Sequence, residues 1–331
     1  MKGWLGITLG DPGGIGPEVT LKALVRIQAD NSDPFKYLIL GDARILRELN
    51  TLLPADIPLA EFKSPDQAGR FFFTHTGPAL PRDFAQGSPI TAESAMAALT
   101  EGARRAIAGE LDGIVTAPVN KENIIKLGPA FMGQTEYLSE MAGTERTAMM
   151  LLGADDRGRW LRVALVTTHI PLRDVANKIT GPKIIQTIEL AAQACRELGL
   201  PRARIGVCGL NPHSGEGGKI GNEEIETITP AVEQAKSRGI DATGPIPADT
   251  LFYYAYNGHY DAIVAMYHDQ GLAPLKMIGF ESGINWTVGL PFIRTSPDHG
   301  TGYDITGKNK ANPESMLAAI NLARQLARQR P

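Results

Sequence analysis

The sequence predicts an α/β protein built around a largely parallel sheet. Short apolar runs alternate with helix-like segments, the runs are rich in Val, Ile and Leu without alternating polar residues, and glycines and prolines gather at their ends. Continuous apolar runs are typical of strands covered on both faces, and their alternation with helices is typical of parallel sheets. Open α/β sheets bind ligands at the carboxyl ends of their strands, so we expect the loops there to carry the function.

Six strands and four helices are expected in chain order. The strands are Leu5–Leu9, Tyr37–Leu40, Gly113–Thr116, Leu161–Thr167, Ile205–Gly209 and Ala262–Met266. The helices are Thr91–Ala108, Pro182–Leu198, Asn222–Arg238 and Pro313–Arg328. The first of these helices has apolar residues at helical spacing, and the second follows a glycine and opens on proline, which is favoured at a first helical position.

Length and composition limit the class of protein. The chain has 331 residues, of which 43% are hydrophobic and 21% charged, and a net charge of −3. A chain this long usually forms two domains. The charge excludes a nucleic-acid or anionic-membrane partner but leaves a small anionic ligand open.

Without a signal segment or a membrane-length apolar run, we expect a soluble cytoplasmic protein. Cys195 and Cys208 lie in apolar stretches and are expected to be small buried residues.

Five stretches are too polar and too rich in glycine for simple connections. They are Gly10–Glu18, Met132–Leu138, Val166–Val175, Gly209–Glu224 and Ala265–Lys276. The first does not fit the dinucleotide fingerprint G-x-G-x-x-G, so a ligand loop and a tight turn remain equal interpretations. In the second, Thr135 as a helix cap with an exposed Gln134 is the favoured interpretation from the residues alone.

Three of the six histidines, His169, His213 and His268, each follow the carboxyl end of an expected strand. In a parallel sheet these ends share one edge. A single histidine there is more often structural, but three neutral imidazoles at one edge favour a divalent-metal site. The other candidates are weaker: His75 and His259 are expected in loops, with His259 exposed. Lys276, Asn285 and Arg294 are donors suited to a phosphate or carboxylate.

Taken together, these stretches resemble the 4-hydroxythreonine-4-phosphate dehydrogenase family of vitamin B6 biosynthesis. The resemblance runs in order over essentially the whole chain and is carried by "GDPGGIGPE", "NPHSGEGGKIGNEE", "GPIPADTLF", "DAIVAMYHDQGLAPLK" and "GLPFIRTSPDHGTGYDITG". It implies an isocitrate/isopropylmalate dehydrogenase-like fold of two α/β/α domains with an interdomain cleft. The first domain would comprise residues 1–125 and 293–331, and the second residues 126–292.

The resemblance also implies roles for single residues. The metal ligands would be His169, His213 and His268, with His268 contributed across the interface of a homodimer. The substrate contacts would be Gln134, Thr135, Lys276, Asn285 and Arg294. His299 and Asp304 would lie near the adenosine of NAD or NADP. Zinc is the expected metal, since three histidines suit it, and cobalt or magnesium remain alternatives. Lys276 and Asp249 are the catalytic candidates, and Glu216 or Asp269 could orient the metal-binding histidines.

Gln134 departs from the family pattern, which has histidine there. Glutamine forms hydrogen bonds but carries no proton at neutral pH, so either the family's histidine only orients the substrate or this chain uses a related substrate. Gly302 and Thr306 also stand where the family usually has alanines.

The implied reaction is oxidation of 4-phosphohydroxy-L-threonine to 2-amino-3-oxo-4-phosphooxybutanoate. That product then decarboxylates to 3-amino-2-oxopropyl phosphate. Related substrates are 4-phosphothreonate, 4-phosphoerythronate and a cis-dihydrodiol carboxylate. A phosphate acyltransferase of similar fold and a non-catalytic binder are more distant alternatives, because neither explains three histidines at strand ends.

Overall fold

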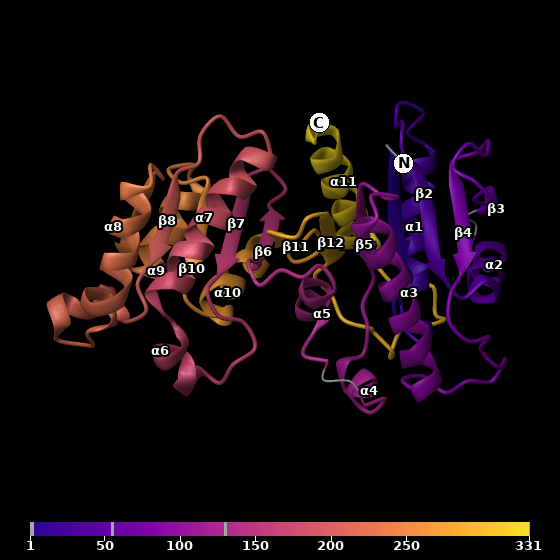
Figure 1. Cartoon of the computed structure of the whole chain (residues 1–331), viewed down its shortest axis with the longest axis horizontal. Coiled ribbons are helices and arrows are strands. Elements are labelled where there is room, and N and C mark those ends of the chain that lie inside the picture. The colour runs from indigo at the N-terminus through magenta and orange to yellow at the C-terminus, as the bar shows by residue number, and fades with distance from the viewer. Residues whose placement is uncertain (1–2, 54–55, 129–130, 331) are drawn as a thin grey trace. The chain divides into compact units, whose positions relative to one another are not determined.

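Two units make up the chain, and the second is inserted into the first (Figure 1). The computed structural model describes residues 3–53, 56–128 and 131–330. The first unit comprises Met1–Glu145 and Leu290–Pro331, and the second comprises Arg146–Gly289. The sequence had placed the divisions after residues 125 and 292. The segment up to residue 145 lies in the first unit because Phe131 and Leu138 are part of that unit's apolar core.

The first unit contains six strands in the order β3-β4-β2-β1-β5-β12, all paired in parallel. They are β1 (Trp4–Thr8), β2 (Lys36–Gly41), β3 (Leu59–Glu61), β4 (Phe71–His75), β5 (Gly113–Thr116) and β12 (Ile293–Pro297). The helices are α1 (Gly16–Gln28), α2 (Ala43–Leu52), α3 (Pro89–Ile107), α4 (Lys121–Ile125), α5 (Gln134–Met141) and α11 (Glu314–Gln329). Helix α3 packs on β1, β2 and β5, whereas α1 packs against α2 and α11.

The second unit has its strands in the order β11-β6-β7-β10-β8-β9. They are β6 (Ala148–Ala154), β7 (Trp160–Leu165), β8 (Ile205–Cys208), β9 (Ala242–Ile246), β10 (Ala262–Ala265) and β11 (Ile284–Val288). Strand β6 is antiparallel to both neighbours, and β7, β10, β8 and β9 are parallel. The two ends of the unit meet, because Val288 is paired with Ala148 and a Cβ on Gly289 would lie 2.1 Å from the Arg146 carbonyl oxygen.

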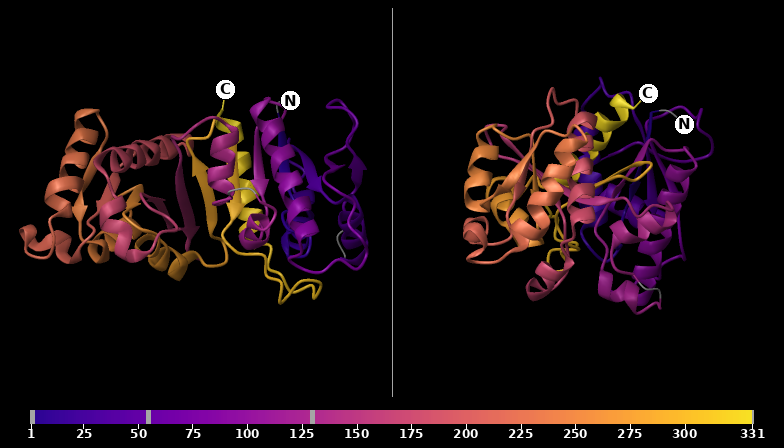
Figure 2. Two further views of the ribbon diagram at one scale, coloured as in Figure 1. Left: turned by 60° about the horizontal axis from the view of Figure 1, so that its bottom comes forward. Right: turned by 60° about the vertical axis from the view of Figure 1, so that its left-hand side comes forward.

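The helical segments of the second unit follow its parallel strands in the chain and lie beside its sheet (Figure 2). They are η1 (Leu172–Asp174), α6 (Val175–Lys178), α7 (Gly181–Glu197), η2 (Pro212–Gly218), η3 (Glu224–Ile228), α8 (Thr229–Ser237), α9 (Ala248–Tyr256) and α10 (His268–Gly279). Helices α7 and α8 pack together, whereas α9 and α10 pack on β10 and β7.

The expected α/β class is confirmed, and so are all six expected strands and three of the four helices, each within two residues at its ends. The segment expected as a single helix over Asn222–Arg238 is instead a π-helical turn, η3, followed by the shorter helix α8. The expectation of strands covered on both faces is confirmed for β1, β5, β8 and β10, whose residues are all buried. Cys195 and Cys208 are buried free thiols, as expected. His259 is exposed, also as expected, but the placement of His75 in a loop is wrong, because it is the last residue of β4.

The described residues include no helix that is both long and apolar enough to cross a membrane.

Candidate active site

Three histidines follow three neighbouring strands of the second unit. His169 comes after β7, His213 after β8 and His268 after β10, and β10 lies between the other two in the sheet. Because these strands are parallel, their carboxyl ends lie at one edge. Thr167 extends the pairing beyond β7, since its backbone N–H and its hydroxyl both donate to the Met266 carbonyl oxygen, at 3.2 and 2.7 Å. This bond fixes the chain just before His169 against the chain just before His268.

His169 and His268 lie close enough to share one ion. Their ring centres are 5.4 Å apart, and the planes are tilted by 42°. Metal–nitrogen distances of about 2.0–2.1 Å place two imidazoles of a tetrahedral site about 5 Å apart, centre to centre. His268 Nδ1 lies 2.7 Å from Asp269 Oδ1. A carboxylate at Nδ1 holds the proton there and leaves Nε2 as a lone-pair donor, which is the usual arrangement of a metal-binding histidine.

His213 sits on a left-handed turn at the mouth of a cavity. Its side chain is exposed, and its φ is 51°. In the part of the chain that the structure describes, no group of three His, Cys, Asp or Glu side chains could hold a metal ion. The described residues of one chain therefore bring His169 and His268 together without forming a three-ligand cluster. Glu216, the expected partner of a metal-binding histidine, is exposed on the same turn.

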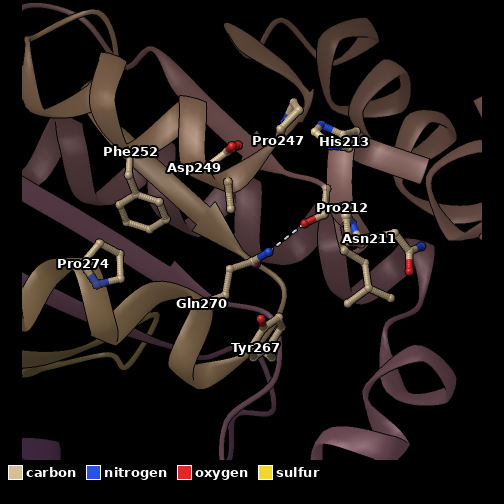
Figure 3. Close-up of a pocket in the computed structure, with 12 residues that line it drawn as sticks. Asn211, Pro212, His213, Pro247, Asp249, Phe252, Tyr267, Gln270 and Pro274 are labelled. Atoms are coloured by element: carbon tan, nitrogen blue, oxygen red, sulfur yellow. Dashed lines mark hydrogen bonds between the residues drawn. The ribbon is translucent and has the colours of Figure 1, made fainter. Parts of the chain in front are cut away.

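The cavity measures about 630 Å³ and lies at the carboxyl ends of β8 and β9, beside α9 and α10 (Figure 3). Its polar lining residues include Asn211, His213, Asp249, Tyr267 and Gln270. Phe252 and Pro274 provide apolar wall. Asp249 stands near the His213 end in the close-up, and its Oδ1 accepts from the backbone N–H of Thr250 at 2.8 Å. The cavity thus combines two of the expected site residues, His213 and Asp249.

Gln270 joins the ends of β10 and β8 at the cavity floor. Its Oε1 accepts from the Met266 N–H, and its Nε2 donates to the Gly209 carbonyl oxygen, both at 2.7 Å. The second of these bonds is the dashed line in Figure 3. One amide side chain thus links the carboxyl ends of two strands that are also paired through their backbones. This residue was not identified from the sequence, where it stands as one polar residue in "YHDQG".

Lys276 and Asn285 lie farther along the second unit. Lys276 is eight residues beyond His268 on α10, which is about 12 Å along a helix. Its Nζ lies 5.8 Å from the centre of the exposed Phe280 ring. Asn285 is in β11, and its Oδ1 is buried without a hydrogen-bond partner among the described residues. Buried amide oxygens normally accept a hydrogen bond, so this oxygen is a candidate to accept one from a ligand.

The first unit carries a separate polar cluster around Arg294, on β12. Arg294 donates from Nε and Nη2 to the Thr116 hydroxyl, at 3.1 and 2.9 Å, and from Nη2 to Gln134 Oε1 at 3.3 Å. Arg294 Nη1 lies 3.5 Å from the Thr135 hydroxyl. Gln134 Nε2 in turn donates to the Ala117 carbonyl oxygen at 3.2 Å. Gln134 and Thr135 therefore form part of the Arg294 site, and the interpretation of Thr135 as a helix cap is wrong, because Gly133 is the N-cap residue of α5.

Burial makes Arg294 an unusual cation. Only 3% of the residue is exposed. Loss of hydration lowers the pKa of the guanidinium to about 10, although the nearby Glu136 acts in the opposite direction. Burial therefore outweighs the attraction of Glu136. An anionic group bound beside Arg294 would offset the hydration free energy that the buried guanidinium has lost.

The loop after β12 is held by the first glycine-rich loop. Tyr303 donates to Asp11 Oδ2 at 2.6 Å, and Asp11 Oδ1 accepts from the Gly13 N–H at 2.8 Å. The Ile15 N–H donates to the Thr301 carbonyl oxygen at 2.8 Å. "GDPGGIGPE" thus acts as a platform for the segment that carries His299 and Asp304. His299 Nδ1 lies 3.1 Å from the Gly300 carbonyl oxygen, and Asp304 is exposed.

Two buried residues of these sites were missed in the sequence. Thr116 looked like the end of an apolar run, and Glu224 looked like one carboxylate among several in "GNEE". Glu224 is 2% exposed and accepts hydrogen bonds from residues 13 and 14 positions earlier. No local spacing signals such a contact, although an acidic residue that ends a glycine-rich loop could have been noted.

Comparison with known proteins relates the whole chain to one family. The family described as "Pyridoxal phosphate biosynthetic protein PdxA" matches residues 33–323. A 4-hydroxythreonine-4-phosphate dehydrogenase from Desulforapulum autotrophicum is 42% identical over 96% of this chain and 94% of its own length. A D-threonate 4-phosphate dehydrogenase from Cupriavidus necator is 43% identical over 98% of each chain.

Solved structures agree with this relationship. The crystal structure of 4-hydroxythreonine-4-phosphate dehydrogenase from Klebsiella pneumoniae matches with a TM-score of 0.84 at 37% identity, over 98% of this chain and all of that chain. The isocitrate dehydrogenase from Methylococcus capsulatus matches with a TM-score of 0.52 at 13% identity, over 99% and 88% of the two chains, which shows a shared fold alone. The expected isocitrate dehydrogenase-like fold is therefore confirmed.

Proposed function

The chain belongs to the PdxA family of pyridoxal phosphate biosynthetic proteins, and from this premise we propose that it is an NAD- and divalent-metal-dependent dehydrogenase of 4-phosphohydroxy-L-threonine. The product, 2-amino-3-oxo-4-phosphooxybutanoate, is a β-keto acid that loses CO2 to give 3-amino-2-oxopropyl phosphate. The observation that carries the proposal is the set of three histidines after three neighbouring parallel strands, two of them with rings 5.4 Å apart. The buried free thiols Cys195 and Cys208 support a reducing compartment, the cytoplasm.

The donor set fits the implied metal. Three neutral imidazoles leave open positions for substrate, and they suit zinc or cobalt better than magnesium, which prefers oxygen ligands. In this proposal His169, His213 and His268 hold the ion, and Asp269 orients His268. The active unit is a homodimer, and the partner's His268 completes each site. When bound, the metal ion would polarise the substrate oxygen, and the nicotinamide would serve as the hydride acceptor.

The chain's own residues bind and orient the substrate. Arg294 and Thr135 take anionic oxygens of the substrate, since a desolvated guanidinium binds such groups strongly. Asn285 Oδ1 accepts a hydrogen bond from a substrate hydroxyl or amine. Asp249 holds the substrate amine. Lys276 holds the carboxylate or donates a proton to the carbon from which CO2 departs. His299 and Asp304 bind the adenosine of NAD or NADP on the loop held by Asp11.

Gln134 supports an orienting role at the position where the family has histidine. Both polar ends of its side chain are engaged with the protein, one with Arg294 and one with the Ala117 carbonyl oxygen. A side chain used in this way holds Arg294 in place and transfers no proton. The similarity to the Cupriavidus necator D-threonate 4-phosphate dehydrogenase makes 4-phosphothreonate the second candidate substrate.

A substrate panel tests the proposal. Wild type and Gln134→His are supplied with NAD, a divalent metal and one of four substrates: 4-phosphohydroxy-L-threonine, 4-phosphothreonate, 4-phosphoerythronate or a cis-dihydrodiol carboxylate. We expect NADH absorbance to rise fastest with 4-phosphohydroxy-L-threonine and to stop after chelation of the metal. We expect Gln134→His to keep the same order of preference.

A different leading substrate would replace the proposed one, and full activity in the presence of chelator would remove the metal from the proposal. An absence of NADH formation with all four substrates would contradict the dehydrogenase itself.

A further inference from the structure

We propose that Glu224 is a positioning residue for His213: its buried carboxylate fixes the left-handed turn that presents the imidazole. The inference rests on the proposed function, because it takes His213 as a metal ligand. Glu224 is the first residue of η3, a single π-helical turn, and is 2% exposed. It does not itself line the cavity but is bonded to Leu210 and Asn211, which do, so its effect on the reaction would act through the chain that leads to His213.

The Glu224 carboxylate accepts hydrogen bonds from donors at the start of the turn. Its Oε1 accepts from the backbone N–H groups of Leu210 and Asn211, both at 2.7 Å. Its Oε2 accepts from Asn211 Nδ2 at 2.9 Å. These donors lie two and three residues before His213. A buried carboxylate with three such bonds acts as an anchor, because hydrogen bonds to a charged acceptor are roughly twice as strong as neutral ones.

The turn itself needs an anchor. Five consecutive residues from His213 to Gly217 have positive φ, with values of 51°, 53°, 82°, 47° and 66°. Three of them, His213, Ser214 and Glu216, are not glycine, and such residues are rarely stable in the left-handed region without surrounding support. The imidazole direction depends on this backbone. A relaxed turn would move His213 away from the position in which it can meet the other two histidines.

The backbone wraps closely around the carboxylate. A Cβ on Gly209 would lie 2.6 Å from the Ser214 hydroxyl and 3.1 Å from Glu224 Oε1, and one on Gly215 would lie 2.7 Å from Glu224 Oε2. At both positions, therefore, a side chain larger than that of glycine would collide with Glu224 or with the turn around it. Loss of the carboxylate would therefore act directly on the backbone of the turn.

The decisive variant is Glu224→Gln, which keeps the size of the side chain. One of its two terminal atoms becomes an NH2 group that faces a donor, either the two backbone N–H groups or Asn211 Nδ2. Full-length wild type and variant, both metal-free, are titrated with Co²⁺ alone and followed by visible absorption. Residues that orient metal ligands typically change metal affinity about 10- to 100-fold. We expect the Co²⁺ dissociation constant of Glu224→Gln to rise at least about 10-fold.

The matched control is Glu226→Gln, an exposed carboxylate on the same turn of helix, which should leave Co²⁺ affinity unchanged. Hydrogen exchange of the metal-free proteins adds a readout that does not depend on activity. Segment 209–218 should exchange faster in Glu224→Gln than in wild type, whereas the β-strands should not.

Glu224→Gln with wild-type Co²⁺ affinity and wild-type exchange would overturn the positioning role and leave the proposed function standing. A wild-type protein that binds no Co²⁺ would overturn both. If Glu224→Gln does not fold, Asn211→Ala removes the side-chain bonds from Asn211 to Glu224 and to Glu223 and keeps the two backbone bonds to Glu224. We then expect Co²⁺ affinity to fall several-fold, and an unchanged affinity of Asn211→Ala would overturn the inference.

Discussion

At the scale of single residues, the buried charge of Arg294 lowers the stability of the folded protein and provides a binding group for an anion. Its pKa of about 10 in the folded protein lies below the ordinary value of a guanidinium, mainly because burial removes water from the charge. Above about pH 10 the unfolded chain therefore binds more protons, and the stability attributable to this group rises with pH until the unfolded chain has also lost its proton. At neutral pH the burial penalty is fully present, and a bound anion would offset it.

Arg294→Gln should separate the two effects. Glutamine keeps a donor for Thr116 and removes the buried charge. We expect the free energy of unfolding at pH 7.5 to be unchanged or higher by about 1–3 kcal/mol, because buried charges are often replaced without loss. We expect kcat/KM to fall at least about 100-fold. Urea denaturation and steady-state kinetics measure the two quantities. The exposed Arg202→Gln is the control, and a strongly destabilised Arg294→Gln would contradict this account.

Single residues were predictable where they follow a legible strand. His169, His213 and His268 were recognised because apolar runs predict strands and parallel strands share an edge. Asp11, Thr116 and Glu224 were not recognised. Their partners lie 292, 178 and 14 or fewer residues away in the chain, and only the folded structure brings them together. The charge state of Arg294 was also hidden, since "PFIRTSP" does not show how deeply β12 is buried.

At the scale of elements, the loop between β12 and α11 is held against the loop after β1 by a hydrogen bond. Tyr303 donates this bond to Asp11, which is 1% exposed. Burial, and next the bond to Asp11, raise the pKa of Tyr303 to about 12. The stability from this group is fully present below pH 10 and is lost as the pH rises from 10 to 12.

Tyr303→Phe should loosen this loop without touching the metal site. The variant leaves Asp11 Oδ2 buried with one hydrogen bond fewer, which typically costs about 1–3 kcal/mol. We expect KM for NAD to rise several-fold while kcat changes less than about twofold, as expected when uniform binding is lost. The drop in the urea midpoint between pH 10 and 12 should shrink in the variant. An unchanged KM for NAD together with a changed KM for substrate would place the loop at a different ligand.

Elements were predictable when their apolar pattern was continuous. The strands β1, β2, β5, β7, β8 and β10 meet this condition, whereas β4 and β6 also carry continuous apolar runs but were not predicted. Strand β12 reads Ile-Arg-Thr-Ser-Pro, yet every residue is buried, because the polar side chains serve the Arg294 site and the packing of α11. Strand β9 contains Gly244 and Pro245, which are residues that argue against a strand. The polar functional residues of β12 and the turn-forming residues of β9 therefore hide the apolar pattern from which a strand is predicted.

At the scale of the whole molecule, the proposed homodimer raises the question of which chain supplies which histidine. The family resemblance assigns His268 to the partner's site, whereas the 5.4 Å between the rings of His169 and His268 lets one chain supply both. Symmetric dimers make such contacts reciprocal, so each chain would give and receive one ligand.

Mixing two inactive variants decides between these arrangements. The variants His169→Ala and His268→Ala are denatured, mixed and then refolded together. If His169 and His268 of one site come from different chains, each mixed dimer regains one intact site, and about a quarter of wild-type activity should return. This is the expected outcome. If one chain supplies both residues, every site in the mixture lacks a ligand and no activity returns. Each variant refolded alone is the control.

The inserted position of the second unit also sets the order in which the chain can fold during synthesis. Arg146 and Gly289 meet at the ends of a unit whose residues are consecutive, so that unit can close as soon as its last strand leaves the ribosome. The first unit cannot, because β5 pairs with β12 and α11 packs on β12 and α1. The usual order of amino-terminal domain first is therefore reversed here. The earlier half of the chain waits with an unpaired strand edge until translation is nearly complete.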